Sequence, residues 1–163
     1  MNLILQTKRL LLRPLTDEDL DLAIALCTSP DVMRYAGGVL TEEKVIQEMA
    51  NFVKRCAGGC IGIWCVTEIA TGEKLGDAIL LPLPINEDDT NWGLVVGDEL
   101  PEAEIEVGYL FKKSAWGKGY ATEACSRLLK FAFEETPLQE IVAVTDPGNA
   151  ASQHVLKKCG LQD

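Results

Sequence analysis

A glycine-rich turn between a strand-like segment and a helical one constrains the fold of this chain more than any other feature. The turn is SAWGKGYATEA at 114–124, with an alternating apolar run at 105–111 before it and a strongly helical run at 120–133 after it. Gly117 and Gly119 carry no Cβ, so a ligand can approach the backbone closely there. The first N–H groups of a helix lack intrahelical partners, and the helix dipole adds partial positive charge. The sequence therefore predicts an anion site, best suited to a phosphate or pyrophosphate.

The charge balance limits the partners of the chain. A formal net charge of -10 argues against a nucleic-acid binder, because phosphate backbones require a basic face. The same charge is compatible with a cationic substrate such as an amine. Lys112, Lys113 and Lys118 form a local positive spot beside the turn, which supports a negatively charged ligand at that place.

Length and composition are those of an ordinary globular protein. A chain of 163 residues is expected to form one domain, 1–163, that buries roughly two-thirds of the surface of its unfolded state. No apolar run is long enough to span a membrane. The segment at 1–15 places charges after a short apolar stretch and offers no small-residue cleavage site, so we do not interpret it as a signal peptide. A cytoplasmic protein is expected.

The six cysteines are expected to be small buried hydrophobic residues. They contain no CxxC pair, and the cluster at positions 56, 60 and 65 has no histidine near it and matches no usual zinc spacing. No metal site is predicted.

Hydrophobic periodicity and turn residues predict an α/β (α+β) chain with the element order β-α-α-β-β-β-α-β-α and a mixed, mostly antiparallel sheet flanked by helices. In the first half we expect a strand at 8–14, a helix from Thr16 to about Cys27, a second helix capped by Thr41, and strands at 61–68 and 74–83 joined by a turn at 70–73. In the second half we expect a loop at 86–101 with room for a short strand at 92–96, a strand at 104–111, the helix at 120–133, a strand at 138–145, and a last helix from Asn149 to about Cys159.

Two common phosphate-binding motifs do not fit the turn. A P-loop has four residues between its glycines and a Ser or Thr after its Lys, and GKG at 117–119 has neither. The dinucleotide fingerprint GxGxxG would place its third glycine at Thr122. It also requires an acidic residue at the end of the next strand, whereas the acidic pair at 134–135 ends a helix.

Three motifs in the correct order resemble the GNAT superfamily of N-acetyltransferases. WGKGYA at 116–121 is similar to the family's acetyl-CoA loop, Arg/Gln-x-x-Gly-x-Gly/Ala, although Trp116 stands at the Arg/Gln position. EVGY at 106–109 and NAASQHVLKKCG at 149–160 resemble the segments that precede and follow that loop. The opening TKRLLLRPLTDEDL is similar to the branch of N-terminal acetyltransferases of ribosomal proteins, as is WGKGYATEA. The resemblance covers nearly the whole chain.

This resemblance implies an enzyme that moves the acetyl group of acetyl-CoA to a primary amine, of a protein N-terminus or a small molecule, by direct attack. The CoA pyrophosphate would lie on backbone N–H groups of 117–121, and the pantetheine arm would add to the edge of the strand at 109–111. A backbone N–H near Leu110 would stabilise the thioester oxygen. The cofactor-binding residues that the resemblance implies are Tyr109, Leu110, Phe111, Trp116, Gly117, Lys118, Gly119, Tyr120, Ala121, Asn149 and Ser152.

The acceptor amine must lose a proton before it attacks, and this requires a general base. Glu106 is our first choice for the base and Glu104 the second. Strand alternation places both on the face opposite Tyr109, where surface charges are the alternative interpretation.

The proton for the departing thiolate has no obvious donor. Many relatives use a Tyr on the last helix, where this chain has Leu156. Because a thiol has a pKa of about 8.5, the thiolate leaves readily, and solvent or Ser152 could protonate it. A purely structural alternative is that Asn149 caps the helix by accepting from the N–H of Ser152. The only histidine, His154, lies off the apolar stripe of this helix, so we expect it in solvent.

The end of the chain leaves other functions open. Relatives continue with one more strand, whereas this sequence has Leu161 in place of Phe and stops at Asp163. Either the sequence is truncated, or a partner subunit, as in a homodimer, closes the edge of the sheet. A catalytically weak acyl-CoA-binding module or sensor is therefore the alternative function, and a nucleotide-binding domain is a third.

Overall fold

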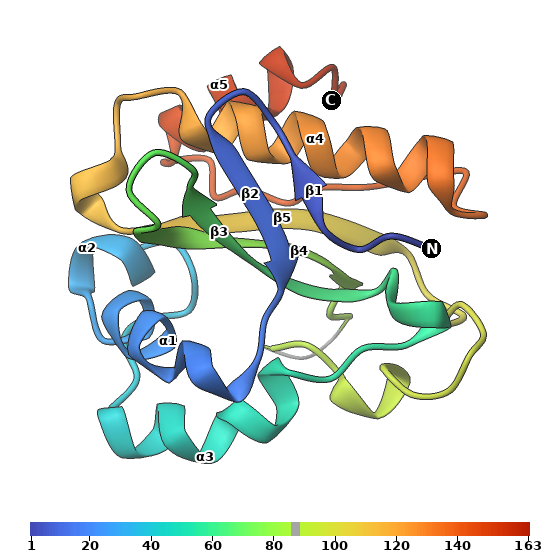
Figure 1. The fold of residues 1–163 in the computed structure, drawn as a ribbon, viewed down its shortest axis with the longest axis horizontal. Coiled ribbons are helices and arrows are strands. Elements are labelled where there is room, and N and C mark those ends of the chain that lie inside the picture. The colour runs from blue at the N-terminus through green and yellow to red at the C-terminus, as the bar shows by residue number, and fades with distance from the viewer. Residues whose placement is uncertain (86–88) are drawn as a thin grey trace.

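The centre of the computed structural model is a five-stranded antiparallel sheet (Figure 1), and the structure describes residues 1–85 and 89–163. The strands lie side by side in chain order, each paired with the next. They are β1 (Leu5–Gln6), β2 (Leu10–Pro14), β3 (Gly62–Glu68), β4 (Lys74–Pro82) and β5 (Ile105–Phe111). The predicted turn at 70–73 closes the β3–β4 hairpin, with the N–H of Glu68 donating to the carbonyl of Glu73 at 2.9 Å.

Helices cover both faces of the sheet (Figure 1). The long helix α4 (Tyr120–Glu135) and the last helix α5 (Ala150–Lys158) lie on one face. The helices α1 (Leu20–Cys27), α2 (Pro30–Met33) and α3 (Glu42–Phe52) lie on the other. The predicted mixed fold with a mostly antiparallel sheet is confirmed.

Capping residues set the helix starts that the sequence predicts. Thr16 and Asp19 form a capping box, and the chain makes a 3₁₀ turn at Asp17–Asp19 before α1 begins. The hydroxyl of Thr41 accepts from the N–H of Lys44 at 3.1 Å at the start of α3. These side chains satisfy N–H groups that a helix cannot pair internally.

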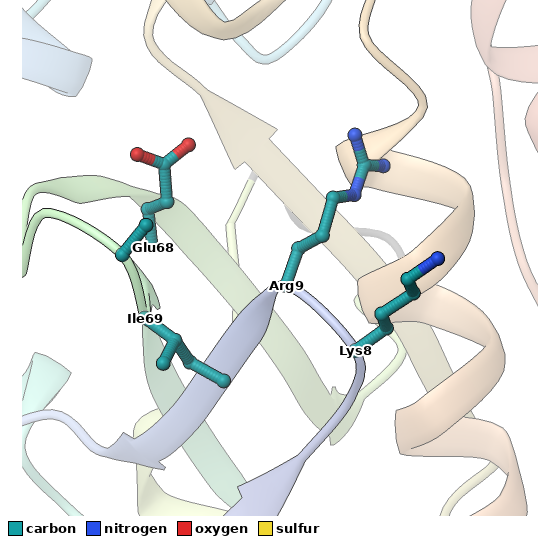
Figure 2. A pocket seen from close by; sticks show the side chains of 5 residues that line it. Lys8, Arg9, Glu68 and Ile69 are labelled. Atoms are coloured by element: carbon teal, nitrogen blue, oxygen red, sulfur yellow. The ribbon is translucent and has the colours of Figure 1, made fainter.

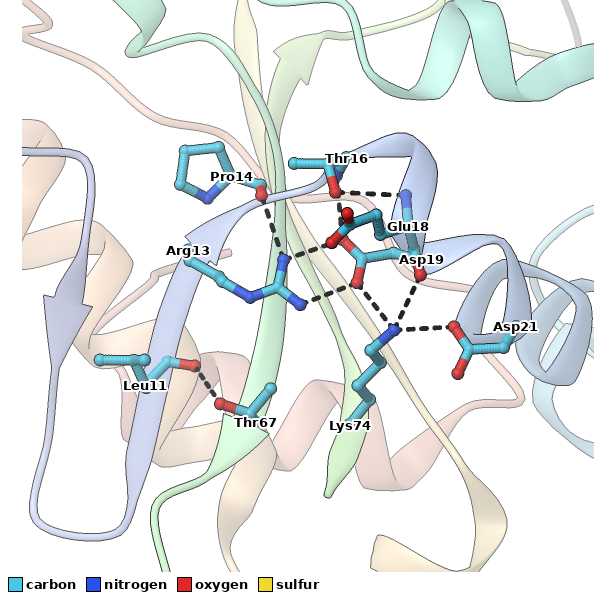
Figure 3. Close-up of polar contacts among 9 residues, drawn as sticks. All are labelled: Leu11, Arg13, Pro14, Thr16, Glu18, Asp19, Asp21, Thr67 and Lys74. Atoms are coloured by element: carbon cyan, nitrogen blue, oxygen red, sulfur yellow. Dashed lines mark hydrogen bonds and ion pairs between the residues drawn. The ribbon is translucent and has the colours of Figure 1, made fainter. Parts of the chain in front are cut away.

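A buried ionic contact fastens the start of α1 to the sheet (Figure 3). Asp19 is fully buried and accepts two hydrogen bonds from Arg13 of β2, at 2.8 and 2.9 Å. Lys74 of β4 lies 3.0 Å from the same carboxylate. Burial alone would raise the pKa of Asp19, but the bonds from Arg13, Thr16 and Lys74 hold it well below its usual value. The charge is therefore compensated.

The main hydrophobic core lies between the sheet and α4. Trp64 of β3 and Phe131 of α4 meet edge to face, with ring centroids 5.7 Å apart, and both are fully buried. All six cysteines are free thiols. Five are buried, as predicted, with Cys125 fully buried in α4, whereas Cys159 is only half-buried. In the described parts of the chain, no helix is long and apolar enough to cross a bilayer, and no trio of His, Cys, Asp or Glu gathers into a metal site.

Two predicted strands are wrong. Residues 92–94 form a 3₁₀ turn, because Asn91 caps it by accepting from the N–H of Gly93 at 3.1 Å. Residues 86–88 of the same predicted loop lie outside the described residues. Among the described residues, the segment at 138–145 pairs with the sheet only through a parallel bridge between Val142 and Glu106. Past this bridge the segment leaves β5, so no ladder forms.

Candidate active site

The turn after β5 forms the start of α4 as predicted. A 3₁₀ turn at Lys113–Ala115 leads to Gly117 and Gly119, whose φ angles are 74° and 82°. This left-handed conformation favours glycine. Gly119 is the N-cap residue of α4 and has no side chain with which to cap the helix. The N–H groups of the first turn therefore stay available to a ligand, and Lys118 is exposed beside them.

Residues from the other end of the chain hold this helix start in place. The carboxylate of Glu123, in the first turn of α4, accepts from the hydroxyl of Thr7, and from the backbone N–H and Nε of Arg9 at 3.1 and 2.8 Å. The Arg9 guanidinium lies over the ring of Tyr120, 4.4 Å from its centroid. The Tyr120 hydroxyl in turn donates to Glu68 at 2.5 Å. Sequence reasoning missed these contacts, because only the fold brings 7–9 next to 120–123.

A small pocket lies beside this contact (Figure 2). Its volume is about 280 Å³, and its lining includes Lys8, Arg9, Glu68 and Ile69. Figure 2 shows the Arg9 side chain extending toward α4. The cationic side of the pocket therefore faces the helix start, where an anion is expected.

The backbone of β5 is open on the edge away from β4. The N–H of Leu110 donates to Oδ1 of Asp77, and that of Lys112 to the carbonyl of Leu75, so the even-numbered N–H groups face β4. The N–H of Val107 donates to Val142 on the opposite edge, at 2.9 Å. Alternation then points the N–H groups of Tyr109 and Phe111 at the open edge. The free donor expected near Leu110 is thus that of Tyr109, and Leu110 itself faces the wrong way.

Glu106 and Glu104 lie in different surroundings. Glu106 is half-buried, and its side chain lies on the face of β5 that does not carry Val107. Burial raises its pKa to about 7. Glu104 is exposed and precedes the strand. Glu106 can therefore take up a proton near neutral pH.

A second carboxyl on the same face was not predicted. Asp77 of β4 lies directly opposite Leu110 in the β4–β5 ladder. Burial also raises its pKa to about 7, partly offset by the hydrogen bond from Leu110. A single acidic residue in a strand has no local signature of such a role. Its only sequence signal is its position in the apolar run 74–82.

The start of α5 approaches the open edge of β5. Asn149 accepts from the N–H of Ser152 at 3.2 Å, which confirms the helix-capping interpretation. The hydroxyl of Ser152 also lies 3.0 Å from that of Tyr109. His154 is exposed, as expected, and Leu156 is the buried residue of the helix. The contact between Tyr109 and Ser152 spans the gap between β5 and α5, so the candidate cofactor residues of both elements meet there.

Two further contacts border this gap. Trp116 is 45% exposed, and its indole N–H donates to the carbonyl of Phe111 at 2.9 Å, so part of its role is packing. Asp31 of α2 pairs with Lys113 at 3.1 Å, and the Tyr35 hydroxyl donates to Gly148 at 3.1 Å. The α2 region thus connects the end of β5 with the turn before α5.

The chain matches the family model described as an acetyltransferase (GNAT) domain over residues 9–162. It belongs to the GNAT acetyltransferase family. The uncharacterized Bacillus subtilis protein YkkB is 32% identical over 159 residues, which are 96% of this chain and 84% of YkkB. The FsC-acetyl coenzyme A-N(2)-transacetylase of Aspergillus fumigatus is 31% identical over 159 residues, 96% of this chain and 64% of that protein. The chain therefore spans under two-thirds of the length of this second relative.

Solved structures agree with this family. The crystal structure of an acetyltransferase (GNAT family) from Bacillus anthracis has a TM-score of 0.76 and 26% identity, and the match covers 98% of this chain and 83% of that one. Ribosomal-protein acetyltransferases occur among more distant relatives, beside other GNAT members. GNAT enzymes use acetyl-CoA to acetylate amines, so the family supplies the reaction class while the acceptor stays open.

Proposed function

We propose that this GNAT domain, residues 1–163, transfers the acetyl group of acetyl-CoA to a primary amine of a small molecule or a peptide N-terminus by direct attack. The observation that carries the proposal is the half-buried Glu106 on β5, whose open edge leads to the uncapped start of α4. The six free thiols are consistent with a reducing, cytoplasmic compartment.

The cofactor would extend along β5 and end at α4. Backbone N–H groups from Gly117 to Ala121 would bind the pyrophosphate, with Lys118 nearby. The amide groups of the pantetheine arm would pair with the open edge at Tyr109 and Phe111, as a peptide adds to a sheet. The other side chains along this path would be those of Leu110, Trp116, Tyr120, Asn149 and Ser152.

The chemistry follows from the groups around Tyr109. Glu106, in its carboxylate form, takes a proton from the ammonium group of the acceptor, directly or through water. The free amine attacks the thioester carbon, and the N–H of Tyr109 stabilises the oxygen as it gains charge. When the carbon–sulfur bond breaks, the nitrogen releases its second proton to solvent and the amide forms. The thiolate takes a proton from solvent or from Ser152, whose hydroxyl contacts that of Tyr109 and regains its proton from solvent.

The pH dependence of the reaction follows from the pKa of Glu106. Since this pKa is about 7, kcat/KM should rise with pH up to about 7 and then level off, as the base becomes deprotonated. Glu106→Gln removes the base and should lower kcat about 100-fold with acetyl-CoA affinity unchanged. Glu104→Gln, the matched control, should stay within about twofold of wild type. An unchanged kcat for Glu106→Gln would exclude Glu106 as the base.

The first experiment is a calorimetric titration of the purified chain with acetyl-CoA, and with ATP and NAD as controls. Selective binding of acetyl-CoA, followed by acetylation of members of an amine panel, is the expected result. Selective binding without turnover would favour the alternative, a weak acyl-CoA-binding module or sensor. The observation that favours this alternative is the buried Leu156, which stands where a proton donor could lie. Preference for ATP or NAD would contradict both.

A further inference from the structure

Asp77 and Glu106 face the same side of the sheet. In the β4–β5 ladder, Leu81 lies opposite Glu106, Ile79 opposite Gly108 and Asp77 opposite Leu110. Directly opposed residues project to one face, as does every second residue along each strand. This is the face covered by α1, which packs against β4 (Figure 1). Burial, and then the Asp77 carboxylate, raise the pKa of the Cys27 thiol of that helix.

The Asp77 carboxylate lacks the partners that a buried charge normally has. Within residues 1–85 and 89–163, it forms no ion pair, and its one hydrogen bond is the 3.1 Å contact from the N–H of Leu110. The thiols of Cys27 of α1 and Cys65 of β3 are ionisable groups near it. Beyond Cys65 on the same face, Arg13 and Lys74 pair with Asp19 and form no ion pair with Asp77. Asp19, by contrast, has both Arg13 and Lys74 as partners. An uncompensated carboxylate in a half-buried position is unfavourable for the free protein, and a cationic ligand would compensate it.

The register places this carboxylate near the expected reaction centre. The N–H of Tyr109 marks the position of the thioester oxygen, and Gly108 next to it presents no side chain to the α1 face. Glu106 precedes Gly108 by two residues, and Asp77 is level with Leu110, two residues beyond, on the neighbouring strand. Two residues of a strand span about 7 Å. The Ile79 side chain of β4 lies over Gly108 on this face. An amine packed against Ile79 has Glu106 on one side, and Asp77, the diagonal neighbour of Gly108 across the ladder, about 7 to 8 Å away on the other.

We propose that Asp77 binds a second positively charged group of the acceptor, so that the enzyme prefers α,ω-diamines and lysine-like amines over monoamines. The spacing suits the two nitrogens of 1,4-diaminobutane, one placed for attack and the other on Asp77. This inference rests on the proposed function. It assigns Asp77 to acceptor recognition and leaves proton removal to Glu106.

The test compares two matched amines at pH 8, where both carboxyls are ionised. Initial rates with saturating acetyl-CoA are measured for 1,4-diaminobutane and for n-butylamine, which lacks the second nitrogen. The wild-type chain should show a kcat/KM about tenfold or more higher for the diamine, the size expected for one charge-assisted hydrogen bond. Asp77→Asn should bring the ratio close to one by raising KM for the diamine, with kcat nearly unchanged. Its amide oxygen can still accept from Leu110, so the fold is preserved.

Two variants separate this role from the others. Glu106→Gln should lower kcat for both amines and keep the preference for the diamine. Asp98→Asn, a change at an exposed carboxylate, should alter neither. Equal rates for the two amines in the wild type, or a preference that survives Asp77→Asn, would overturn the proposal and leave the acetyltransferase function intact.

A chain that binds acetyl-CoA yet acetylates neither amine would count against the proposed function, and direct binding then decides the role of Asp77. The probe is 1,4-diaminobutane titrated calorimetrically into the protein saturated with coenzyme A. A binding heat that Asp77→Asn abolishes supports the assignment. The absence of binding, or equal heats in both proteins, overturns it.

Discussion

Strand β5 is paired with β4 along its whole length, from Gly76–Phe111 to Pro82–Ile105, whereas its other edge meets one bridge at Val142. In the proposed function, a ligand pairs with the backbone groups of Tyr109 that face this second edge. The comparison shows how one strand serves two purposes. The paired edge fixes the position of the strand, and the open edge offers the amide groups with which an extended, peptide-like molecule can pair.

The polar side chains divide in the same way. Near the α4 start, the charges are matched: Glu123 has Thr7 and Arg9, and Arg9 also lies over Tyr120. On the α1 face of the sheet, neither Asp77 nor Glu106 forms an ion pair within the described residues. Charges that are paired fix the geometry of a site, whereas carboxyl groups without an ion pair are candidates for binding a cation or taking up a proton. The following predictions separate the two kinds of position, beginning with the largest expected effect.

Two glycines test the paired edge. A Cβ at Gly76 would overlap the carbonyl oxygen of Leu110 in β5, whereas a Cβ at Gly108 would lie 3.1 Å from the flexible side chain of Ile79. We expect Gly76→Ala to lower the free energy of unfolding by about 3 kcal/mol, and Gly108→Ala by less than about 1 kcal/mol. Urea denaturation measures both. Equal losses in the free energy of unfolding would show that the close approach of β4 to β5 at Gly76 does not limit the size of the side chain there.

Gly119→Glu tests the ligand side. It places a side chain at a φ of 82° and a negative charge at the start of α4. Affinity for acetyl-CoA should fall about 100-fold or more, because anion binding there depends on close approach and positive potential. Gly97→Glu is the control, since Gly97 has a φ of 76° and room for a side chain but lies in a loop elsewhere. Isothermal titration gives both constants, and equal losses would remove the special role of Gly119.

The unmatched carboxyls should make stability depend on pH. The pKa values of Asp77 and Glu106 are raised to about 7 in the folded state, from 3.8 and 4.5. Between about pH 4 and 7 the folded chain therefore binds more protons than the unfolded one, and the free energy of unfolding falls as the pH rises. Asp19 acts in the opposite sense, because its pKa is lowered in the folded state. Its contribution to stability is lost only as the pH falls below the ordinary value of 3.8.

Chemical denaturation at several pH values measures this fall. Asp77→Asn and Glu106→Gln should each reduce it, by an amount of order 1 kcal/mol once solvent screening is taken into account. Asp98→Asn should leave the profile unchanged. A fall that neither variant alters would show that other groups cause it.

The smallest effect concerns the contact across the open edge. Ser152→Ala removes the 3.0 Å contact with the Tyr109 hydroxyl. The loss should be about 1 kcal/mol, seen as a few-fold weaker binding of acetyl-CoA. Ser114→Ala, at an exposed position of the preceding turn, should have no effect. If both variants bind acetyl-CoA equally well, α5 contributes nothing to the cofactor site.

The sequence predicts the local parts of this molecule well. Caps at Thr16, Thr41 and Asn149 are visible because a cap and the N–H it satisfies are two or three residues apart. The glycine turn at 117–119 is visible for the same reason, since its φ angles are a local property.

What the sequence could not predict depends on register and on distant partners. That Leu110 faces β4 while Tyr109 faces the gap follows from the pairing of β4 with β5. That Asp77 forms no ion pair in the described residues depends on which side chains the fold brings near it. The segment at 138–145 has the composition of a strand, and a strand forms only where a neighbour runs alongside it. Among the described residues, that neighbour is present only near Val142.

The contact of Thr7 and Arg9 with Glu123 joins residues that are 116 and 114 positions apart. The start of α4 is therefore complete only after the first strands have found the last third of the chain, and contacts of such separation form slowly. Acetyl-CoA cannot select its site in a half-assembled chain, so it stabilises the finished domain as a unit, by RT ln(1 + [L]/Kd). A chain that binds the cofactor is therefore one that has completed its folding.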